Sequence, residues 1–469
     1  EFKEDSIMSM VVQHNMQAAN ANRMLGITSG AQAKSTEKLS SGYKINRAAD
    51  DAAGLTISEK MRKQIRGLDK ASSNAQDGVS SVQTAEGALT EVHSMLQRMN
   101  ELATQAANGT NSQDDRSAIQ DEVDQLTTEI DRVAETTKFN EIYLLKGDSE
   151  GATKTSYLNA HDAGLDGTKI SQNDTTATVT LKELNVGDKQ SIAGKEYTIG
   201  DSVTNIKALV KDKNTIKIGD QTFKISGTDV TDENGNKLYI KTADGANAAN
   251  TTFAANNLTS TSKFKNDAGA DTANTAVTIA NIQSLITDDS RVTVNGKEMY
   301  AMAAADATAG VSSVDSSVIT VTQAYKKEAA EIVKASNIGA TTSSVATTDG
   351  TTAYAGASNS FVLKLGTTTV NDSLAFNLHV GADADMTNKI NVNIDSMDSA
   401  SLGIKGLNVT DKTGIAATYA IDAISDAVAK VSAQRSSLGA VQNRLEHTID
   451  NLDNISENTS SAESRIRDT

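Results

Sequence analysis

Proline is absent from all 469 residues, and this absence, together with one long apolar seam, restricts the fold most strongly. At the usual ~5% proline, a chain of this length without any is improbable by chance. An interior proline costs a helix about 3 kcal/mol, so its absence indicates long uninterrupted helices. The seam follows steps of three and four through Ile57, Met61, Leu68, Ala71, Ala75, Gly78, Val82, Ala85, Leu89, Val92, Leu96, Met99, Ala103 and Ala106. A seam sustained over several heptads predicts helices packed lengthwise, as in a coiled coil.

Two features interrupt this seam. Gln64 is the one polar residue in the apolar series, and each helical glycine weakens an isolated helix by roughly 1 kcal/mol. We expect neighbouring helices to press closely against these glycines, which are Gly54, Gly67, Gly78 and Gly87. A turn signal at residues 108–111 ends the helix, and Ser112 with Asp115 resembles the capping box of a second helix.

The C-terminal part repeats the helical pattern. Apolar residues at helical spacing from Ile421 to Ile455 predict a helix of about 45 residues, on the order of 65–70 Å long. A helix that long with one apolar side must pack on a partner, and the long N-terminal helix is the obvious candidate. The two ends of the chain are therefore predicted to pair, with the middle as an insertion at the far tip.

The middle, residues 148–372, is rich in Thr, Gly, Asp and Val and is predicted to be β-rich. Alternating residues around turns predict three hairpins, and the Asn295-Gly296 turn is the strongest signal among them. These hairpins cover residues 191–199, 215–225 and 291–300. Short helices are expected near 202–213 and 323–337. The fold class is thus mixed: a coiled-coil-like helical rod from both ends and an inserted β-rich α+β outer domain. No motif in the outer domain indicates a functional site.

Charge and motifs exclude several functions. Lys and Arg number 44 against 60 Asp and Glu, so the net charge of −16 disfavours nucleic acid and anionic membranes as partners. Cysteine is absent, no apolar run approaches the ~20 residues of a membrane span, and no Sec-type signal is visible. No metal-ligand spacing, phosphate loop or dinucleotide fingerprint occurs. We therefore expect no enzyme activity, no cofactor and no metal site.

A rod that carries a polar outer domain has two possible uses. Such rods can pack side by side into a fibre or tube with the outer domain outside. The alternative is a monomeric stalk or surface adhesin whose function lies in the outer domain. Periodicity does not choose between them.

Several stretches at both ends, in order, resemble bacterial flagellin. On the N-terminal side they are Asn20–Ile27, Glu37–Gly54, Leu96–Thr110, Glu129–Val133 and Lys138–Asn140, and on the C-terminal side Ser437–Leu445 and Ser464–Asp468. Residues 378–382 with 402–404 resemble the β-hairpin element of that family's rod. The hook–filament junction proteins share the helical ends, but residues 47–54 and 440–444 favour filament flagellin.

The resemblance implies a structural subunit of the flagellar filament. Such a subunit leaves the cell through the flagellar type III export channel, assembles with copies of itself outside the cell, and meets an export chaperone and a filament cap. A chain without Cys or Pro should thread without disulfides or slow isomerisation. The family continues past Asp468 with another helix of some 40 residues, which leaves polymerisation of this chain an open question, and residues 1–9 look like a vector remnant.

The resemblance also implies domains and a receptor site. It places an inner-tube helix at 10–46, the rod domain at 47–147 and 373–469, and the variable outer domain at 148–372. Host Toll-like receptor 5 reads the rod of this family, and three positions of its contact motif are present: Arg98, Leu102 and Glu122. An Arg supplies a fork of donors and a Leu an apolar anchor, which suits a binding hot spot.

Overall fold

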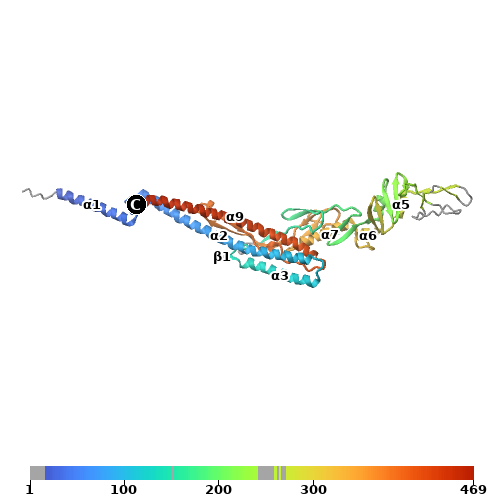
Figure 1. Cartoon of the computed structure of the whole chain (residues 1–469), viewed down its shortest axis with the longest axis horizontal. Helices are drawn as coiled ribbons and strands as arrows, with labels where there is room; N and C mark the ends of the chain where they lie inside the picture. Colours follow the sequence, from blue (N-terminus) through green and yellow to red (C-terminus); the bar gives the residue numbers. More distant parts are fainter. Residues whose placement is uncertain (1–15, 149–152, 241–257, 261–262, 266–270, 469) are drawn as a thin grey trace, which may run out of the picture. The chain divides into compact units, whose positions relative to one another are not determined.

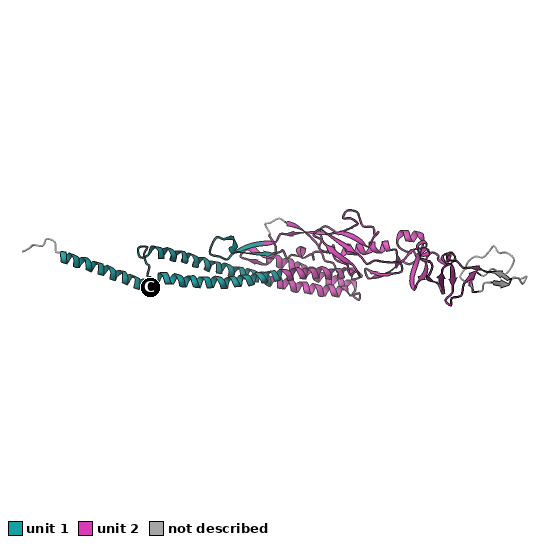
Figure 2. Ribbon diagram, turned by 90° about the horizontal axis from the view of Figure 1, so that it is seen from above, with its two compact units in different colours: residues 1–87, 375–394, 434–469 teal, residues 88–374, 395–433 magenta. Residues whose placement is uncertain are grey.

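The computed structural model describes residues 16–148, 153–240, 258–260, 263–265 and 271–468 (Figure 1). The first nine residues, which are expected to be a vector remnant, lie outside this range. The chain divides into two compact units, coloured separately in Figure 2. The first comprises residues 1–87, 375–394 and 434–469, and the second comprises residues 88–374 and 395–433. Each unit therefore combines segments from both halves of the sequence.

Long helices form both ends of the chain, as predicted, and short ones punctuate the middle. They are α1 (Met16–Ser41), α2 (Ala52–Ala107), α3 (Gln113–Thr136), α4 (Val203–Leu209), α5 (Ile279–Leu285), α6 (Ala304–Ala309), α7 (Val321–Ala335), the 3-10 helix η2 (Met386–Asn388), α8 (Ser399–Leu402) and α9 (Ile415–Arg467). The 53-residue α9 is longer than the 45 residues that its apolar spacing indicated.

In the first unit, α2 and α9 pack antiparallel along their seams. The hydroxyl of Ser58 donates to Glu463 Oε1 at 2.9 Å, and that of Ser72 donates to Asp453 Oδ1 at 3.0 Å. The numbering rises along one helix as it falls along the other, so the predicted pairing of the two ends is confirmed. The seam itself begins later than predicted, because Ile57 is 46% exposed and Ser58 takes the buried position.

A two-stranded sheet of β23 (Leu374–His379) and β24 (Lys389–Ile394) belongs with these helices. Asn74 Nδ2 donates to the His379 carbonyl at 3.0 Å, and Gln434 Nε2 donates to the Asn393 carbonyl at 3.0 Å. The expectation that residues 402–404 form the second strand is wrong. Gly403 instead ends α8 in the left-handed conformation, with φ of 79°.

Two of the helical glycines lie against the β23–β24 hairpin, and one of them, Gly78, also lies against Leu445 of α9. A Cβ at Gly78 would lie 2.3 Å from Leu378 Cδ1, and one at Gly67 would lie 3.1 Å from the Ala382 Cα. Gly54 is crowded by Ile45 and Asp51, whereas nothing lies within 4 Å of a Cβ at Gly87. At three of the four glycines the missing side chain therefore lets neighbouring atoms lie close to α2, whereas no atoms lie close at Gly87.

The second unit contains most of the strands. Their bounds are β1 (Lys138–Phe139), β2 (Ile142–Tyr143), β3 (Thr153–Tyr157), β4 (Lys169–Gln172), β5 (Thr176–Thr180), β6 (Lys189–Ile192), β7 (Lys195–Ile199), β8 (Asp201–Ser202), β9 (Thr215–Ile218), β10 (Gln221–Ser226), β11 (Asp229–Thr231), β12 (Tyr239–Ile240), β13 (Leu258–Thr259), β14 (Lys263–Lys265), β15 (Asp271–Ala273), β16 (Thr275–Ala276), β17 (Ser290–Val294), β18 (Lys297–Met302), β19 (Val318–Ile319), β20 (Val345–Thr347), β21 (Ser360–Lys364) and β22 (Thr367–Asn371).

All three predicted hairpins are present as β6–β7, β9–β10 and β17–β18. Asn295 and Gly296 have φ of 52° and 84°, the positive pair that a type I′ turn requires. The last two hairpins join in a six-stranded sheet of order β11-β10-β9-β17-β18-β8, and a four-stranded sheet has the order β20-β21-β5-β4.

Two apolar cores lie in this strand-rich insert. One gathers Val179, Ile332 and Phe361 between the four-stranded sheet and α7, and the other gathers Ile216, Phe223 and Val292 on the six-stranded sheet. The first and last strands of the insert pair with each other, from Thr153 opposite Asn371 to Tyr157 opposite Thr367. The chain therefore leaves the insert beside the point where it enters.

Candidate functional site

The candidate site lies where α3 packs against the end of α2. The predicted capping box is present: Ser112 accepts from the Asp115 amide, and Asp115 accepts from the Ser112 amide at 3.0 Å. The buried Arg116 guanidinium then donates to the carbonyls of Ala106 at 2.9 Å and Asn108 at 3.0 Å. These are orphan carbonyls at the C-terminal end of α2, so Arg116 satisfies them and fixes the turn into α3.

The other side of α3 is bonded to the segment before α9. The Gln120 side chain donates to the Leu407 carbonyl at 2.9 Å and accepts from the Val409 amide at 2.7 Å. Asp131 accepts from the amide and the hydroxyl of Ser399, at 2.7 and 2.9 Å. These contacts hold α3 in one position along α2, which is the requirement for a preorganised surface.

Arg98 and Glu122, two of the three predicted contact residues, meet on that surface. Arg98 Nε lies 2.9 Å from Glu122 Oε1, and Arg98 Nη1 lies 3.1 Å from Glu101 Oε2. The hydrogen bond that Arg98 donates to Glu122, and then the one that it donates to Glu101, raises the pKa of Arg98. The side chains of Arg98 and Glu122 remain 49% and 44% exposed, so both are accessible to a partner.

Leu102, the third predicted residue, is buried rather than exposed. Its side chain is 2% exposed and belongs to the buried face of α2. Leu102 follows Met99 by three residues and precedes Ala106 by four, which is the spacing of the seam itself. In the isolated chain Leu102 therefore supports the Arg98 surface from beneath.

Arg116 was not singled out from the sequence. It stands three residues before Ile119, at the position where the apolar seam of α3 begins. A charged residue at a seam position, close to a helix end rich in unpaired carbonyls, is the signal that could have identified it. Gln120 and Asp131 carry no comparable signal in the sequence.

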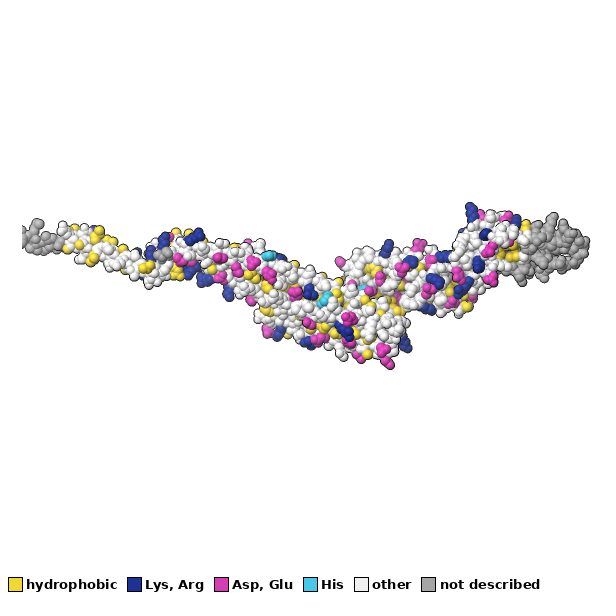
Figure 3. Space-filling view, in the orientation of Figure 1, with side chains coloured by type: hydrophobic (Ala, Val, Ile, Leu, Met, Phe, Trp, Pro, Cys, Tyr) yellow, Lys and Arg dark blue, Asp and Glu magenta, His cyan; other side chains and the backbone are white. Residues whose placement is uncertain are grey.

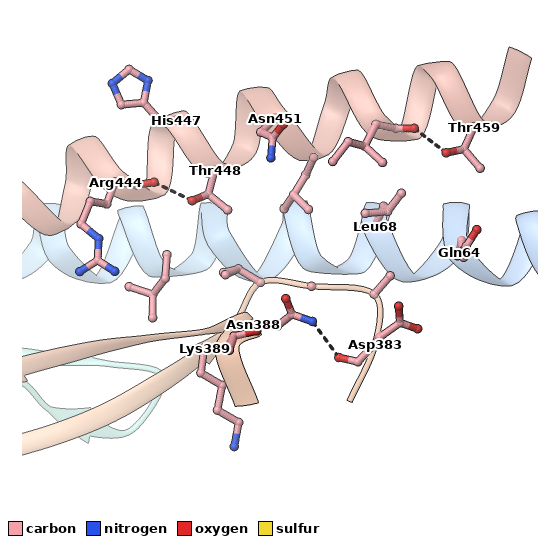
Figure 4. A pocket seen from close by; sticks show the side chains of 17 residues that line it. Gln64, Leu68, Asp383, Asn388, Lys389, Arg444, His447, Thr448, Asn451 and Thr459 are labelled. Carbon is pink, nitrogen blue, oxygen red and sulfur yellow. Dashed lines mark hydrogen bonds between the residues drawn. The ribbon is translucent and has the colours of Figure 1, made fainter. Parts of the chain in front are cut away.

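A groove lies in the first unit, between the β23–β24 connection and the two long helices (Figure 4). This groove has a volume of about 670 Å³. Leu68, Leu452 and Ala382 supply apolar lining, while Arg444 and Lys389 supply positive charge. Gln64 lines it too, which explains the polar interruption of the seam: α2 faces this open groove there.

No cluster of three or more His, Asp or Glu side chains suited to a metal ion occurs within the described ranges. Across the same part of the chain, no helix is both long and apolar enough to cross a bilayer. The groove and the Arg98 surface both bear polar and charged groups. Both arrangements suit binding between surfaces.

Two family models match the helical ends. The bacterial flagellin N-terminal helical region matches residues 12–150, and the bacterial flagellin C-terminal helical region matches residues 421–469. A flagellin of Clostridium tyrobutyricum is 36% identical over 462 residues, which is 98% of this chain and 92% of that protein. A flagellin of Salmonella choleraesuis is 34% identical, with the same two coverages.

Solved structures of related proteins align over much of the chain with low superposition scores. The structure of FliC from Burkholderia pseudomallei is 17% identical, with a TM-score of 0.24, and covers 78% of this chain and 99% of that one. A flagellar hook associated protein-3 from Legionella pneumophila is 15% identical, with a TM-score of 0.34, and covers 87% of this chain and 98% of that one. The family is therefore assigned from the sequence relatives. This chain belongs to the bacterial flagellin family, the structural subunits of the extracellular flagellar filament.

Proposed function

We propose that this chain polymerises through its helical ends to form the flagellar filament. The observation that carries the proposal is α1, whose 26 residues, all described, include none that is buried. Its Met24, Leu25 and Ile27 are each at least 59% exposed. An isolated helix gains most of its stability from packing an apolar face, so α1 requires a partner. Neighbouring subunits supply such a partner in a homopolymer.

Electron microscopy of the concentrated chain, seeded with short filament fragments, tests this proposal. We expect filaments from the unmodified chain and none from a Leu25→Glu, Ile27→Glu variant. A Gln32→Glu variant is the matched control, because it adds charge to α1 at an exposed polar position, and it should polymerise. A chain that stays monomeric after seeding would refute assembly through these ends.

The domain assignment is part of the same proposal. We assign the inner-tube helix to 10–46, the rod domain to 47–147 and 373–469, and the outer domain to 148–372. Pairing of β3 with β22, whose ends lie at Thr153 and Asn371, supports the limits of the outer domain. The break between Ser41 and Ala52 supports the first limit, and residues 10–15 lie outside the described part.

Export by the flagellar type III system, with an export chaperone and a filament cap as further partners, follows from this function. The absence of cysteine and proline supports passage in an unfolded state. The test compares culture supernatants of strains with and without a working flagellar export apparatus. Release that does not depend on the apparatus would refute this route.

We also propose that Toll-like receptor 5 binds the rod surface around Arg98 and Glu122. Support comes from the exposure of this ion pair and from the bonds that fix α3 beneath it. Leu102 then acts by positioning the surface. Arg98→Ala should weaken binding of the monomeric chain to the receptor ectodomain by at least about tenfold, the effect of a moderate hot spot.

Arg132→Ala is the matched control for that measurement. Arg132 is also exposed and pairs with a glutamate three residues away, Glu129, but lies elsewhere on α3. Its removal should leave receptor binding unchanged. Equal binding by the Arg98 and Arg132 variants would remove this role.

A further inference from the structure

Exposed apolar side chains of the helical ends gather in two places. Outside α1, whose apolar surface is visible in Figure 3, few large apolar side chains are exposed there. Within residues 52–147 and 373–468, all of them described, these are Ile57, Ile142, Tyr143, Met386 and Ile455. Two of them are neighbours in β2. Ile455 lines the groove of Figure 4, and Met386 adjoins one of its lining residues. Ile57 precedes the lining residue Gln64 by seven positions, so the two share a face of α2.

The first place is the tip of the β1–β2 hairpin, residues 138–143, which is held in one conformation. Its turn residues Asn140 and Glu141 have φ of 46° and 68°, the positive pair of a type I′ turn. A glutamate in the left-handed region is strained, and such strain persists only where the surrounding structure holds it. Leu144, directly after the hairpin, is 1% exposed, and its amide donates to the Thr137 carbonyl at 3.0 Å. The base of the tip is therefore anchored, while its two apolar side chains stay 45% and 38% exposed.

The second place is the groove of the first unit, which has an apolar floor and charges at its edges. Leu68 and Leu452 are 7% and 5% exposed, and Ile455 beside them is 41% exposed. Figure 4 shows Arg444 and Asp383 on opposite sides of the groove, and neither has an ion-pair partner among the described residues. The volume of about 670 Å³ lies within the range of pockets that bind a small molecule, about 300–1,000 Å³. The groove can therefore hold several side chains of a partner.

The charges of the tip are matched by charges of the groove. Lys138 and Glu141 lie 3.5 Å apart on the tip, with side chains 49% and 87% exposed. An exposed pair of this kind adds little stability, so both groups can exchange partners at small cost. The groove offers Arg444 to the carboxylate and Asp383 to the ammonium group. Lys389 adds a second cation to the lining, so the groove as a whole favours the strongly exposed carboxylate.

We propose that the β1–β2 tip of one copy docks in the groove of a second copy. Ile142 and Tyr143 then cover the floor at Leu68 and Leu452, and a tyrosine with an aliphatic neighbour is a common anchor of protein interfaces. The contact is head-to-tail, since every copy carries both surfaces, and repetition of such a contact generates an open helical polymer. It rests on the proposed polymerisation and names two of the faces that meet.

Photocrosslinking identifies what occupies the groove. The chain has no cysteine, so Asn451→Cys places a single thiol on the groove lining, where a benzophenone maleimide is attached. This variant is mixed with the isotope-labelled unmodified chain, seeded, irradiated and digested with trypsin. We expect the crosslink on the isotope-labelled peptide 139–146, which lies between Lys138 and Lys146. Asn454→Cys is the matched control, because Asn454 is exposed on the same helix outside the groove lining, and it should not label that peptide.

The outcomes separate this contact from the assembly proposal. Filaments whose groove label lies on any other segment, or on none, overturn the contact and keep the assembly. A crosslink to the isotope-labelled peptide 139–146 without filaments supports the contact and overturns the assembly. Absence of both the crosslink and the filaments overturns both proposals.

An apolar-to-polar substitution measures the contribution of the tip. Ile142→Asn removes an exposed apolar anchor, so the critical concentration for polymerisation should rise about tenfold or more. Val345→Asn is the matched control, because Val345 is an apolar strand residue of the insert that is 49% exposed. It should polymerise at the concentration of the unmodified chain. Equal defects in the two variants would overturn the contact.

A charge exchange tests the orientation of the tip in the groove. Glu141→Arg and Arg444→Glu each bring like charges together, so each alone should raise the critical concentration about fivefold, and less at high salt. When one chain carries both substitutions, the opposite charges face each other again, and the critical concentration should return close to that of the unmodified chain. A double variant that polymerises no better than the single variants would overturn the contact.

Discussion

In the first unit, α2 and α9 join residues that are far apart in the sequence, whereas the insert of the second unit combines such distant pairs, as between β3 and β22, with hairpins of near neighbours. Ser58 and Glu463 are separated by 405 positions, while β17 and β18 are joined by the two residues of one turn. A contact between residues that are hundreds of positions apart must offset a large loss of loop-closure entropy. A hairpin closes a short loop, so its contacts have a smaller entropy loss to offset. The helical pair therefore depends on the quality of its seam, and the insert depends on its turns, its distant strand pairs and its two apolar cores.

Removing a seam side chain should break the helical pair with the largest effect. Leu445 is fully buried against Ala75, Val380 and Ile390. Leu445→Ala should lower the free energy of unfolding of the first unit by about 2–5 kcal/mol, since it leaves a cavity that the helices only partly fill. Urea unfolding followed by circular dichroism measures the loss.

Ile455→Ala is the control for that change, because Ile455 is an apolar α9 residue that is 41% exposed. It should cost less than about 1 kcal/mol. Hydrogen exchange in the strands of the insert should be unaffected by Leu445→Ala. Equal losses from the two variants would show that the seam is not what holds the helices together.

The sequence predicted most of the fold because it carries clear local signals for its long helices and for its hairpins. The seam of α2 and the turn at Asn295-Gly296 are local patterns, and both are present. Helices α5 and α6 were missed, although α4, which is as short as α5, was expected near 202–213. The second strand of the sheet in the first unit was also missed, although Ile390, Val392 and Ile394 alternate as a strand does.

The candidate site was less predictable. Arg98 and Glu122 were selected through a resemblance, and no sequence pattern predicted that these residues of two different helices form an ion pair. The burial of Leu102 in the free chain could have been expected from the seam spacing. The role of Arg116 is signalled only in part, since its acceptors at Ala106 and Asn108 are near in the sequence while the third, at Lys412, lies 296 residues away.

A rise in pH should lower the stability of the insert and leave that of the helical pair unaffected. Glu328 on α7 is 1% exposed, its Oε2 has no hydrogen-bond partner, and burial raises its pKa from 4.5 to about 7, with Gln190 opposing the shift. The folded-state pKa lies above the unfolded one, so this group's stabilisation is fully present below pH 4.5 and is lost as pH rises through 7. Full ionisation of Glu328 lowers the free energy of unfolding of the insert by about 3 kcal/mol.

Glu328→Gln should therefore remove most of the decrease in stability of the insert between pH 5.5 and 8.5 that this group causes. Urea unfolding followed by tyrosine fluorescence at the two pH values measures it. Glu196→Gln, at an exposed ion pair with Lys189, is the control and should preserve the decrease. A pH dependence that is unchanged by Glu328→Gln would exclude Glu328 as its source.

The smallest predicted effect distinguishes the sheet from the helices as the neighbour that α2 requires. Gly87→Ala adds a Cβ in open space and should stabilise the first unit by about 1 kcal/mol, the helix propensity difference. Gly67→Ala gains the same propensity, but its Cβ would meet the Ala382 Cβ at 3.0 Å and the Ala382 Cα at 3.1 Å. Because backbone atoms yield little, overpacking of about 1–3 kcal/mol should cancel or exceed the gain. Thermal unfolding of the two variants compares them directly. Equal stabilisation would mean that the turn after β23 moves freely on α2, and that the glycine there serves no close contact.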